Sequence, residues 1–272
     1  MLDCARFMDL AGLCRIARAS WTGDSEAMPI HPDILAAVVV TATIQSLFGV
    51  GVLLFGTPIL LVLGYPFVTA LTVLLPISWA INLLQVSQHH AHIDRSFYAK
   101  ILTLSVPCIV VCLVLVTRMT INIGPIVGLF LVLVALKDVF ARVEQWIESL
   151  VRYERAYFVV MGIVHGLTNL GGSLLTAIVH SKHYEKDVQR VTTAVAYGTF
   201  AFFQLLTLLV TLERFPVRFS EAAFYVLAGA GTYLATDKLV YAKIGTGQYR
   251  AIFACFLFVS GIVLILKAML AG

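Results

Sequence analysis

Residues 34–64 read ILAAVVVTATIQSLFGVGVLLFGTPILLVLG. The stretch contains no charged residue, and an apolar run of this length is typical of a membrane-embedded segment. Its middle holds four residues that interrupt a helix, namely Gly49, Gly51, Gly56 and Pro58. Interrupted helices at membrane depth are tolerated where they line a cavity, so we expect this segment to form part of a site.

The composition of the chain excludes most soluble classes of protein. Of its 272 residues, 60% are hydrophobic and 12% are charged, and the mean hydropathy is +0.93. These values predict a polytopic membrane protein of the all-α class. The net charge of +4 is spread over the expected loops, without a basic patch interleaved with aromatic residues, so we expect a lipid bilayer and no nucleic acid as partner.

The cysteines and short motifs predict no cofactor. The five cysteines contain no CxxC pair, and three of them lie in apolar stretches where a thiol packs as a small hydrophobic group. The sequence also lacks a Gly-x-x-x-x-Gly-Lys phosphate-binding loop. We therefore expect no disulfide framework, no metal, no catalytic activity, and transport driven by an ion gradient or by none.

Further apolar blocks follow the first stretch, and several approach the roughly 20 residues that a spanning helix requires. They cover residues 66–87, 99–117, 119–136, 157–180, 191–212, 222–242 and 250–270. Together with residues 34–64 they predict about eight membrane segments.

The blocks divide the chain into four regions. Residues 1–33 carry arginines among apolar residues, which fits an amphipathic helix on the membrane surface or an overextended start before Met28. Residues 34–136 and 157–272 are two membrane repeats. The linker at 137–156 has apolar residues at three- and four-residue steps, which predicts an interfacial helix, with a solvated linker helix as the alternative.

A second glycine-rich interruption lies in the fifth block, in the stretch GIVHGLTNLGGSLL at residues 162–175. Gly171 follows Gly51 by 120 residues, and Gln204 follows Gln85 by 119, which indicates duplicated halves. Interrupted segments at matching places in two halves are typical of a transporter's substrate site, although glycines also serve close helix packing. The first and fifth segments either cross once as broken helices or turn back as re-entrant hairpins, and the distribution of Lys and Arg does not distinguish these cases.

The polar residues at depth favour an anionic or neutral solute. Away from their ends the apolar blocks contain no Lys, Arg or Glu, and Asp237 lies near the end of its block. A cation would require a buried carboxylate, whereas an anion can be held by the free amides at the ends of broken helices. His165 has two possible roles: it carries a proton or donates a hydrogen bond to the anion, or it is a structural histidine. The amides of Gln85 and Gln204 either contact the solute or form hydrogen bonds between helices.

A histidine cluster lies after the second block. His89, His90, His92 and Asp94 resemble metal ligands in spacing. Histidines at the start of a wet loop are more often solvated, so divalent-metal transport is kept only as an alternative function.

The chain resembles the sulfite exporter TauE/SafE family of membrane permeases. GVGVLLFGTPILLVLGY at residues 49–65 is similar to the first glycine-rich stretch of the family, and residues 162–175 are similar to the second. The resemblance implies duplicated halves and movement of sulfur-containing anions such as sulfite and sulfonates.

We therefore expect a multi-pass transporter of the inner or plasma membrane that exports or imports a small anion by alternating access. The predicted substrate-binding residues are Gly49, Gly51, Thr57, Pro58, His165, Asn169, Gly171, Gly172 and Ser173, with Gln85 and Gln204 as secondary polar residues. A second copy of the chain is a further candidate partner. The alternative is a non-transporting assembly or accessory protein, in which the glycines serve only helix packing.

Overall fold

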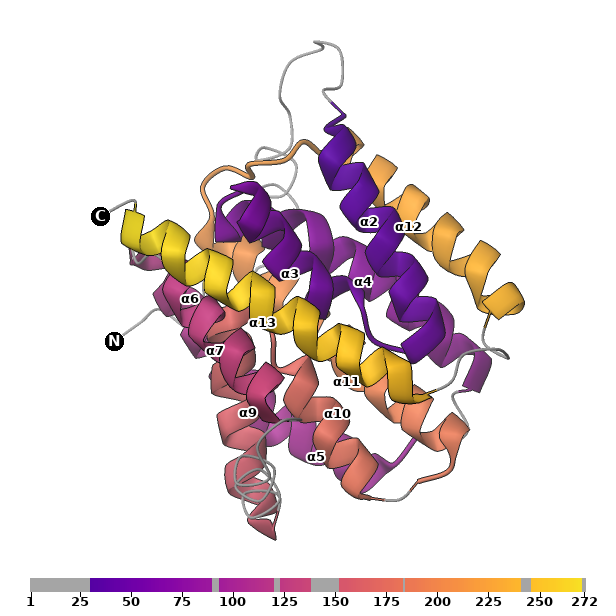
Figure 1. The fold of residues 1–272 in the computed structure, drawn as a ribbon. Helices are drawn as coiled ribbons and strands as arrows, with labels where there is room; N and C mark the ends of the chain where they lie inside the picture. The colour runs from indigo at the N-terminus through magenta and orange to yellow at the C-terminus, as the bar shows by residue number, and fades with distance from the viewer. Residues whose placement is uncertain are drawn as a thin grey trace.

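The computed structural model describes residues 30–89, 93–119, 123–137, 152–182, 184–240 and 246–270 (Figure 1). Within these residues the regular secondary structure is helical, as expected from the composition. The amphipathic segment at 1–33 and the interfacial helix at 137–156 lie almost entirely outside the described residues, and both stay predictions.

The first apolar stretch forms two helices. Helix α2 (Pro32–Phe48) begins with proline in its first turn, where the missing N–H costs no hydrogen bond. It ends at Gly49, whose φ of 74° lies in the left-handed region that glycine adopts without strain. After this break, helix α3 (Val52–Leu63) is capped by Gly51 and Gly64. The helix runs through Gly56 and Pro58, so the prediction that these two residues interrupt it was wrong.

The two helices form a re-entrant hairpin. The Tyr65 hydroxyl, just beyond the end of α3, donates a 2.8 Å hydrogen bond to Asp33 Oδ2 at the start of α2. The Tyr65 ring also lies 6.1 Å from the imidazole of His31. The chain therefore turns back on itself between α2 and α3, which favours a re-entrant segment over a single crossing.

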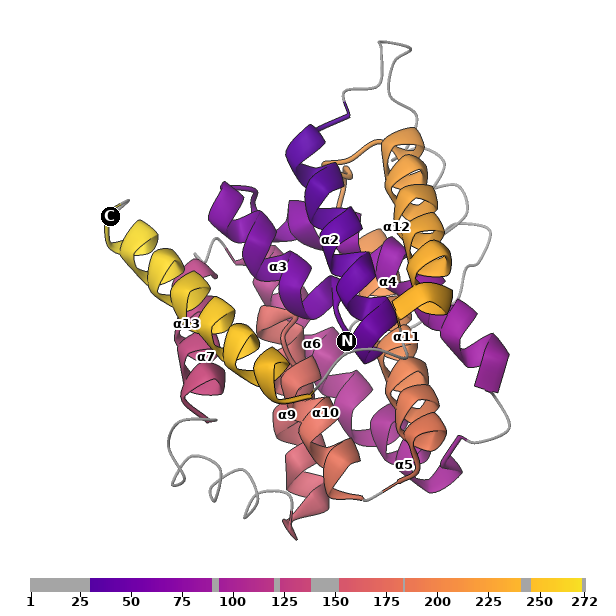
Figure 2. The ribbon, with the colours of Figure 1, turned by 45° about the vertical axis from the view of Figure 1, so that its right-hand side comes forward.

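The fifth apolar block forms a second hairpin. Helix α9 (Glu154–Thr168) ends at Asn169, which has a φ of 62°, and helix α10 (Gly172–Ser181) follows. Glu154 at the start of α9 forms a 2.9 Å salt bridge with Lys182 just after α10. In two views related by rotation, the first hairpin opens at the top of the molecule and the second opens at the bottom (Figures 1 and 2).

The remaining helices enclose the two hairpins. They are α4 (Phe67–His89), α5 (Arg95–Lys100), the π-helical turn η3 (Ile101–Ser105), α6 (Val106–Arg118), α7 (Gly124–Lys137), α11 (Lys186–Thr211), α12 (Phe219–Val240) and α13 (Thr246–Leu270). Three stretches of the described residues are long and apolar enough to cross a membrane: Phe67–Ser87, Arg95–Arg118 and Val188–Thr211. The expectation of about eight membrane segments stays a prediction.

The helices pack in matching pairs. Helix α4 packs on α11 and α7 packs on α13, while α12 lies along α2 and α6 lies along α9 (Figure 2). Close approach in the α7–α13 pair depends on glycine, because a Cβ on Gly128 would lie 2.8 Å from the Gly261 carbonyl oxygen. Gly162 and Gly166 likewise bring α9 against Ser105 and Ile109. These glycines serve helix packing.

Candidate functional site

The closed ends of the two hairpins share two features: a residue of positive φ after the first helix, and a glycine two residues later that lies against that helix. A Cβ on Gly51 would lie 2.7 Å from the Thr41 carbonyl oxygen, and a Cβ on Gly171 would lie 3.0 Å from that of Met161. The amides of Gly49 and Asn169 each donate 2.8 Å hydrogen bonds, to the carbonyl oxygens of Gln45 and His165 respectively. Each interruption thus folds back on the helix before it, which leaves room for glycine alone.

The second closed end contacts the middle of α3. The Asn169 side chain donates a 2.9 Å hydrogen bond from Nδ2 to the hydroxyl of Thr57. Both side chains are buried, with 0% of Asn169 exposed. Two residues that the sequence predicted for the site are therefore joined, one from each half of the chain. Pro58, the next residue of α3, is buried beside them.

His165 links the second hairpin to α11. Its Nε2 lies 3.1 Å from Gln204 Oε1, and its ring lies 4.8 Å from the centroid of Phe200. The imidazole and the Gln204 amide are both completely buried. The structure therefore brings together His165 and Gln204, which the sequence predicted separately. Their hydrogen bond joins α9 to α11, which is what a structural histidine would do.

Several buried polar atoms near these contacts lack a hydrogen-bond partner among the described residues. They are His165 Nδ1, Asn169 Oδ1 and Gln204 Nε2. A buried polar atom without a partner costs free energy, so such atoms are rare unless they serve a ligand or a water molecule. The three atoms belong to side chains at the second closed end or hydrogen-bonded to one there, so this part of the protein is suited to receive a polar solute.

The first closed end is held by a residue that the predicted site did not include. Gln45 accepts a 3.0 Å hydrogen bond from the Val52 amide through Oε1, and its Nε2 donates to Asn82 Oδ1 at 3.3 Å. Asn82 is in turn fixed by Ser78 on α4. Gln45 and Asn82 could have been assigned to the site from the sequence. Both are amide side chains in apolar blocks, and buried amides need hydrogen-bond partners.

The other predicted residues occupy supporting positions. The Ser173 hydroxyl donates to the Leu170 carbonyl oxygen at 3.2 Å, so it is engaged by its own backbone turn. A Cβ on Gly172 would lie 1.0 Å from the Tyr197 hydroxyl oxygen, which explains the glycine. Gln85 is 1% exposed on α4 and lies beside Tyr233. Both polar atoms of its amide are buried without a hydrogen-bond partner among the described residues.

An ion pair lies where the sequence indicated no buried charge. Arg190 on α11 pairs with Asp237 on α12, and it donates a 2.9 Å hydrogen bond to the Tyr233 hydroxyl. A Cβ on Gly49 would lie 3.7 Å from Cγ of this arginine, so the side chain runs past the first closed end. Arg190 and Asp237 each fall at the end of an apolar block, and only the packing of α11 on α12 shows that they meet.

The metal-binding alternative receives no support from the described residues. The carboxylate of Asp94 accepts hydrogen bonds from the backbone amides of Ser96 and Phe97, and from the Tyr184 hydroxyl at 2.5 Å. The Tyr184 hydroxyl and the Phe97 amide hold the pKa of Asp94 below its ordinary value of 3.8. His90 and His92 lie outside the described residues, among which no group of three metal-ligating side chains occurs.

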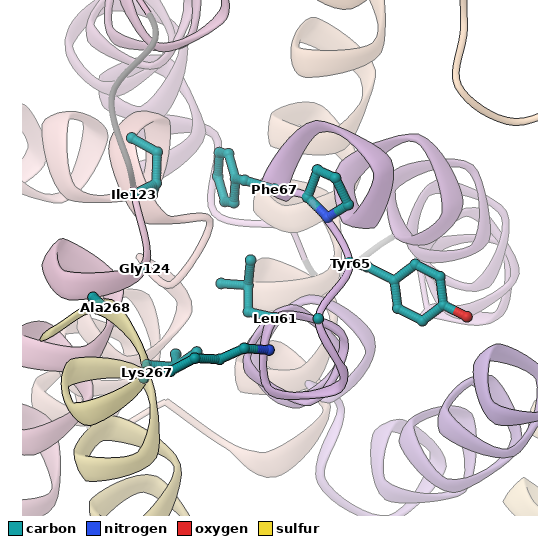
Figure 3. Close-up of a pocket in the computed structure, with 10 residues that line it drawn as sticks. Leu61, Tyr65, Phe67, Ile123, Gly124, Lys267 and Ala268 are labelled. Carbon is teal, nitrogen blue, oxygen red and sulfur yellow. The ribbon is translucent and has the colours of Figure 1, made fainter. Parts of the chain in front are cut away.

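A cavity of about 340 Å³ lies at the open end of the first hairpin, away from both closed ends (Figure 3). Its walls come from α3, α4, α7 and α13, and include Tyr65 and the ammonium-bearing side chain of Lys267. The Lys267 Nζ donates to the Val62 carbonyl oxygen at 3.3 Å. None of the predicted substrate-binding residues lines this cavity.

Comparison with known proteins gives one match. A family model described as sulfite exporter TauE/SafE matches residues 34–264, which cover both hairpins and all the helices between them. No curated protein and no solved structure matches the chain.

Proposed function

The chain belongs to the sulfite exporter TauE/SafE family, and from that premise we propose that it moves sulfite or an organosulfonate across the cell membrane as a secondary transporter. The family consists of membrane exporters of sulfur anions, so transport rather than catalysis is the starting point. The proposal concerns the substrate, the place where it binds and the movement that carries it.

The observation that supports a site is the contact of one closed hairpin end with the other hairpin. Asn169 reaches from the second closed end to Thr57 of the first hairpin, while unpaired Asn169 Oδ1, His165 Nδ1 and Gln204 Nε2 lie around it. Helix α10 begins at Gly172, three residues after Asn169, and the amide end of a helix favours negative charge. The solute we propose is therefore an anion.

We propose alternating access because of how the two halves of the chain are arranged. The closed ends have equivalent constructions at Gly51 and Gly171, and α12 lies along α2 as α6 lies along α9. These correspondences support two duplicated halves, residues 34–136 and 157–272, inserted in opposite directions. Movement of one hairpin relative to the other would open the region of Asn169 and Thr57 first to one face and then to the other.

The test is flux of labelled sulfite in proteoliposomes that contain the wild type or the variant Asn169→Gly. Glycine keeps the left-handed backbone of residue 169 and removes only its amide, so the variant is expected to fold. We expect it to lower the flux about tenfold or more, because it removes both the amide that bonds Thr57 and the buried Oδ1 that has no partner among the described residues. Thr43→Val is the control, since the exposed Thr43 hydroxyl bonds only within its own helix. Wild-type flux equal to that of empty liposomes, for sulfite and for sulfonates, would favour the accessory-protein alternative.

A further inference from the structure

The ion pair of Arg190 with Asp237 is an expensive feature of the fold. The two side chains are 10% and 15% exposed, and Arg190 lies within Val188–Thr211, one of the stretches able to cross a membrane. Removing two charges from water costs more than their attraction commonly returns, and apolar groups would join two helices at lower cost. A buried ion pair within a membrane segment is therefore first considered as a functional group.

The pair adjoins the first closed hairpin end. The Arg190 stem passes the position where Gly49 would carry a Cβ, at 3.7 Å. One turn earlier in α2, the hydroxyl of Ser46 accepts a 2.8 Å hydrogen bond from that of Thr236, the neighbour of Asp237. The charged residues of α11 and α12 are thus fixed against the interruption that ends α2.

We propose that Arg190 binds the transported anion, and that Asp237 occupies the guanidinium when no anion is bound. This inference rests on the transport function proposed above and adds a second contact on the path of the anion, because Arg190 lies 14 residues before Gln204 on α11, about 20 Å along the helix. A guanidinium presents its N–H groups in a planar fork that matches two oxygens of an oxyanion. A carboxylate and a sulfite or sulfonate group present oxygens in a similar way, so the Asp237 carboxylate can bind the same N–H groups when the solute is absent.

Tyr233 supplies the second part of the argument. Its buried hydroxyl accepts a hydrogen bond from the same Arg190 nitrogen that pairs with Asp237. This bond does not involve the carboxylate, so it keeps the guanidinium oriented when Asp237 is displaced. Arginine remains charged at every physiological pH, so its affinity for an anion is controlled by the competing carboxylate.

The experiment compares Arg190→Gln, Asp237→Asn and Lys267→Gln with the wild type. Sulfite affinity is measured by titration calorimetry of the purified full chain, and KM by sulfite flux in proteoliposomes. We expect Arg190→Gln to raise the Kd and KM about tenfold or more, because a charged hydrogen-bonding group is lost. Asp237→Asn removes the competitor and is expected to lower the Kd. Lys267→Gln changes a cation whose one hydrogen bond, among the residues that the structure describes, goes to the Val62 carbonyl oxygen at the far end of the first hairpin. This variant is expected to leave both constants unchanged.

The results separate the inference from the transport function. Wild-type sulfite transport with an unchanged KM in Arg190→Gln would overturn the role of this arginine and leave the transport function standing. If Arg190→Gln does not fold, Asp237→Asn decides, because it keeps the guanidinium: tighter sulfite binding supports the proposal, and unchanged or weaker binding overturns it. A wild type that neither binds nor moves sulfite or sulfonates would overturn both.

Discussion

The side chain of Asn169 donates a 2.9 Å hydrogen bond to the hydroxyl of Thr57, a residue 112 positions earlier in the chain. Asn169 is also the residue that turns the second hairpin, with a φ of 62°. One residue therefore both caps α9, through its backbone amide, and joins the second hairpin to α3, through its side chain. Any relative movement of the two hairpins has to break or carry this bond.

Thr57→Val is expected to lower thermal stability and sulfite flux together. Valine has nearly the shape of threonine and cannot accept the Asn169 proton, so a buried N–H group loses its partner. Within a membrane protein such a loss costs about 1 kcal/mol. Thermal unfolding in detergent and sulfite flux in proteoliposomes measure the two effects. Thr43→Val makes the same substitution at an exposed hydroxyl and should change neither, so equal losses in the two variants would contradict this role of Thr57.

Gly172→Ala is expected to destabilise the second hairpin, although alanine normally favours a helix over glycine by about 1 kcal/mol. The added methyl group would lie 1.0 Å from the Tyr197 hydroxyl oxygen, so the tyrosine or the start of α10 has to move. Overpacking of this kind costs about 1–3 kcal/mol. Gly231→Ala in α12 has no atom within 4 Å of the new Cβ, and should not lower the unfolding temperature. A lower unfolding temperature in both variants would show that replacing any helix glycine destabilises the protein, and that the contact with Tyr197 is not the cause.

The breaks at Gly49–Gly51 and Asn169–Gly171 could be located from the sequence because their cause is local. Glycines in an otherwise apolar run interrupt a helix wherever the rest of the chain places it. The apolar blocks correspond for the same reason to the helices from α4 to α13, since hydrophobicity marks them residue by residue. The equal spacing of the two interruptions also predicted that Asn169 and Thr57 belong to one site.

The direction of the chain after each break could not be derived from the sequence. It depends on contacts between residues at the two ends of a hairpin, Asp33 with Tyr65 and Glu154 with Lys182. Counting loop charges gave no preference, because both topologies distribute them alike. The pairing of Arg190 with Asp237 was missed for a similar reason: each residue falls at the end of an apolar block, and only the packing of α11 on α12 brings them together.

The contact of Tyr184 with Asp94 predicts a pH-dependent contribution to stability outside the membrane segments. The hydroxyl of Tyr184 and the amide of Phe97 lower the pKa of Asp94 from 3.8. Because the folded-state pKa is the lower one, this contribution is fully present above about pH 4 and is lost as the pH falls through the folded-state value. Tyr184→Phe raises the pKa of Asp94 toward its ordinary value and should make the protein less stable above pH 4, with a smaller further loss in acid.

Thermal unfolding of the wild type and of Tyr184→Phe at a series of pH values measures this effect. Tyr153→Phe is the matched control, because Tyr153 is 70% exposed and should leave the pH profile unchanged. Identical profiles for the wild type and Tyr184→Phe would show that the 2.5 Å contact does not bear on stability in solution.

The opposite directions of the hairpins predict opposite sides of the membrane for their open ends. Leu63 at the end of α3 is 49% exposed, and Tyr153 at the start of α9 is 70% exposed. In a variant without native cysteines, Leu63→Cys and Tyr153→Cys are treated separately with a membrane-impermeant maleimide, in sealed vesicles of one orientation. We expect one position to react in intact vesicles and the other only after permeabilisation, because the two hairpins open at opposite ends of the molecule (Figures 1 and 2). Reaction of both positions from the same side would rule out oppositely inserted halves, and with them the alternating movement of the two hairpins.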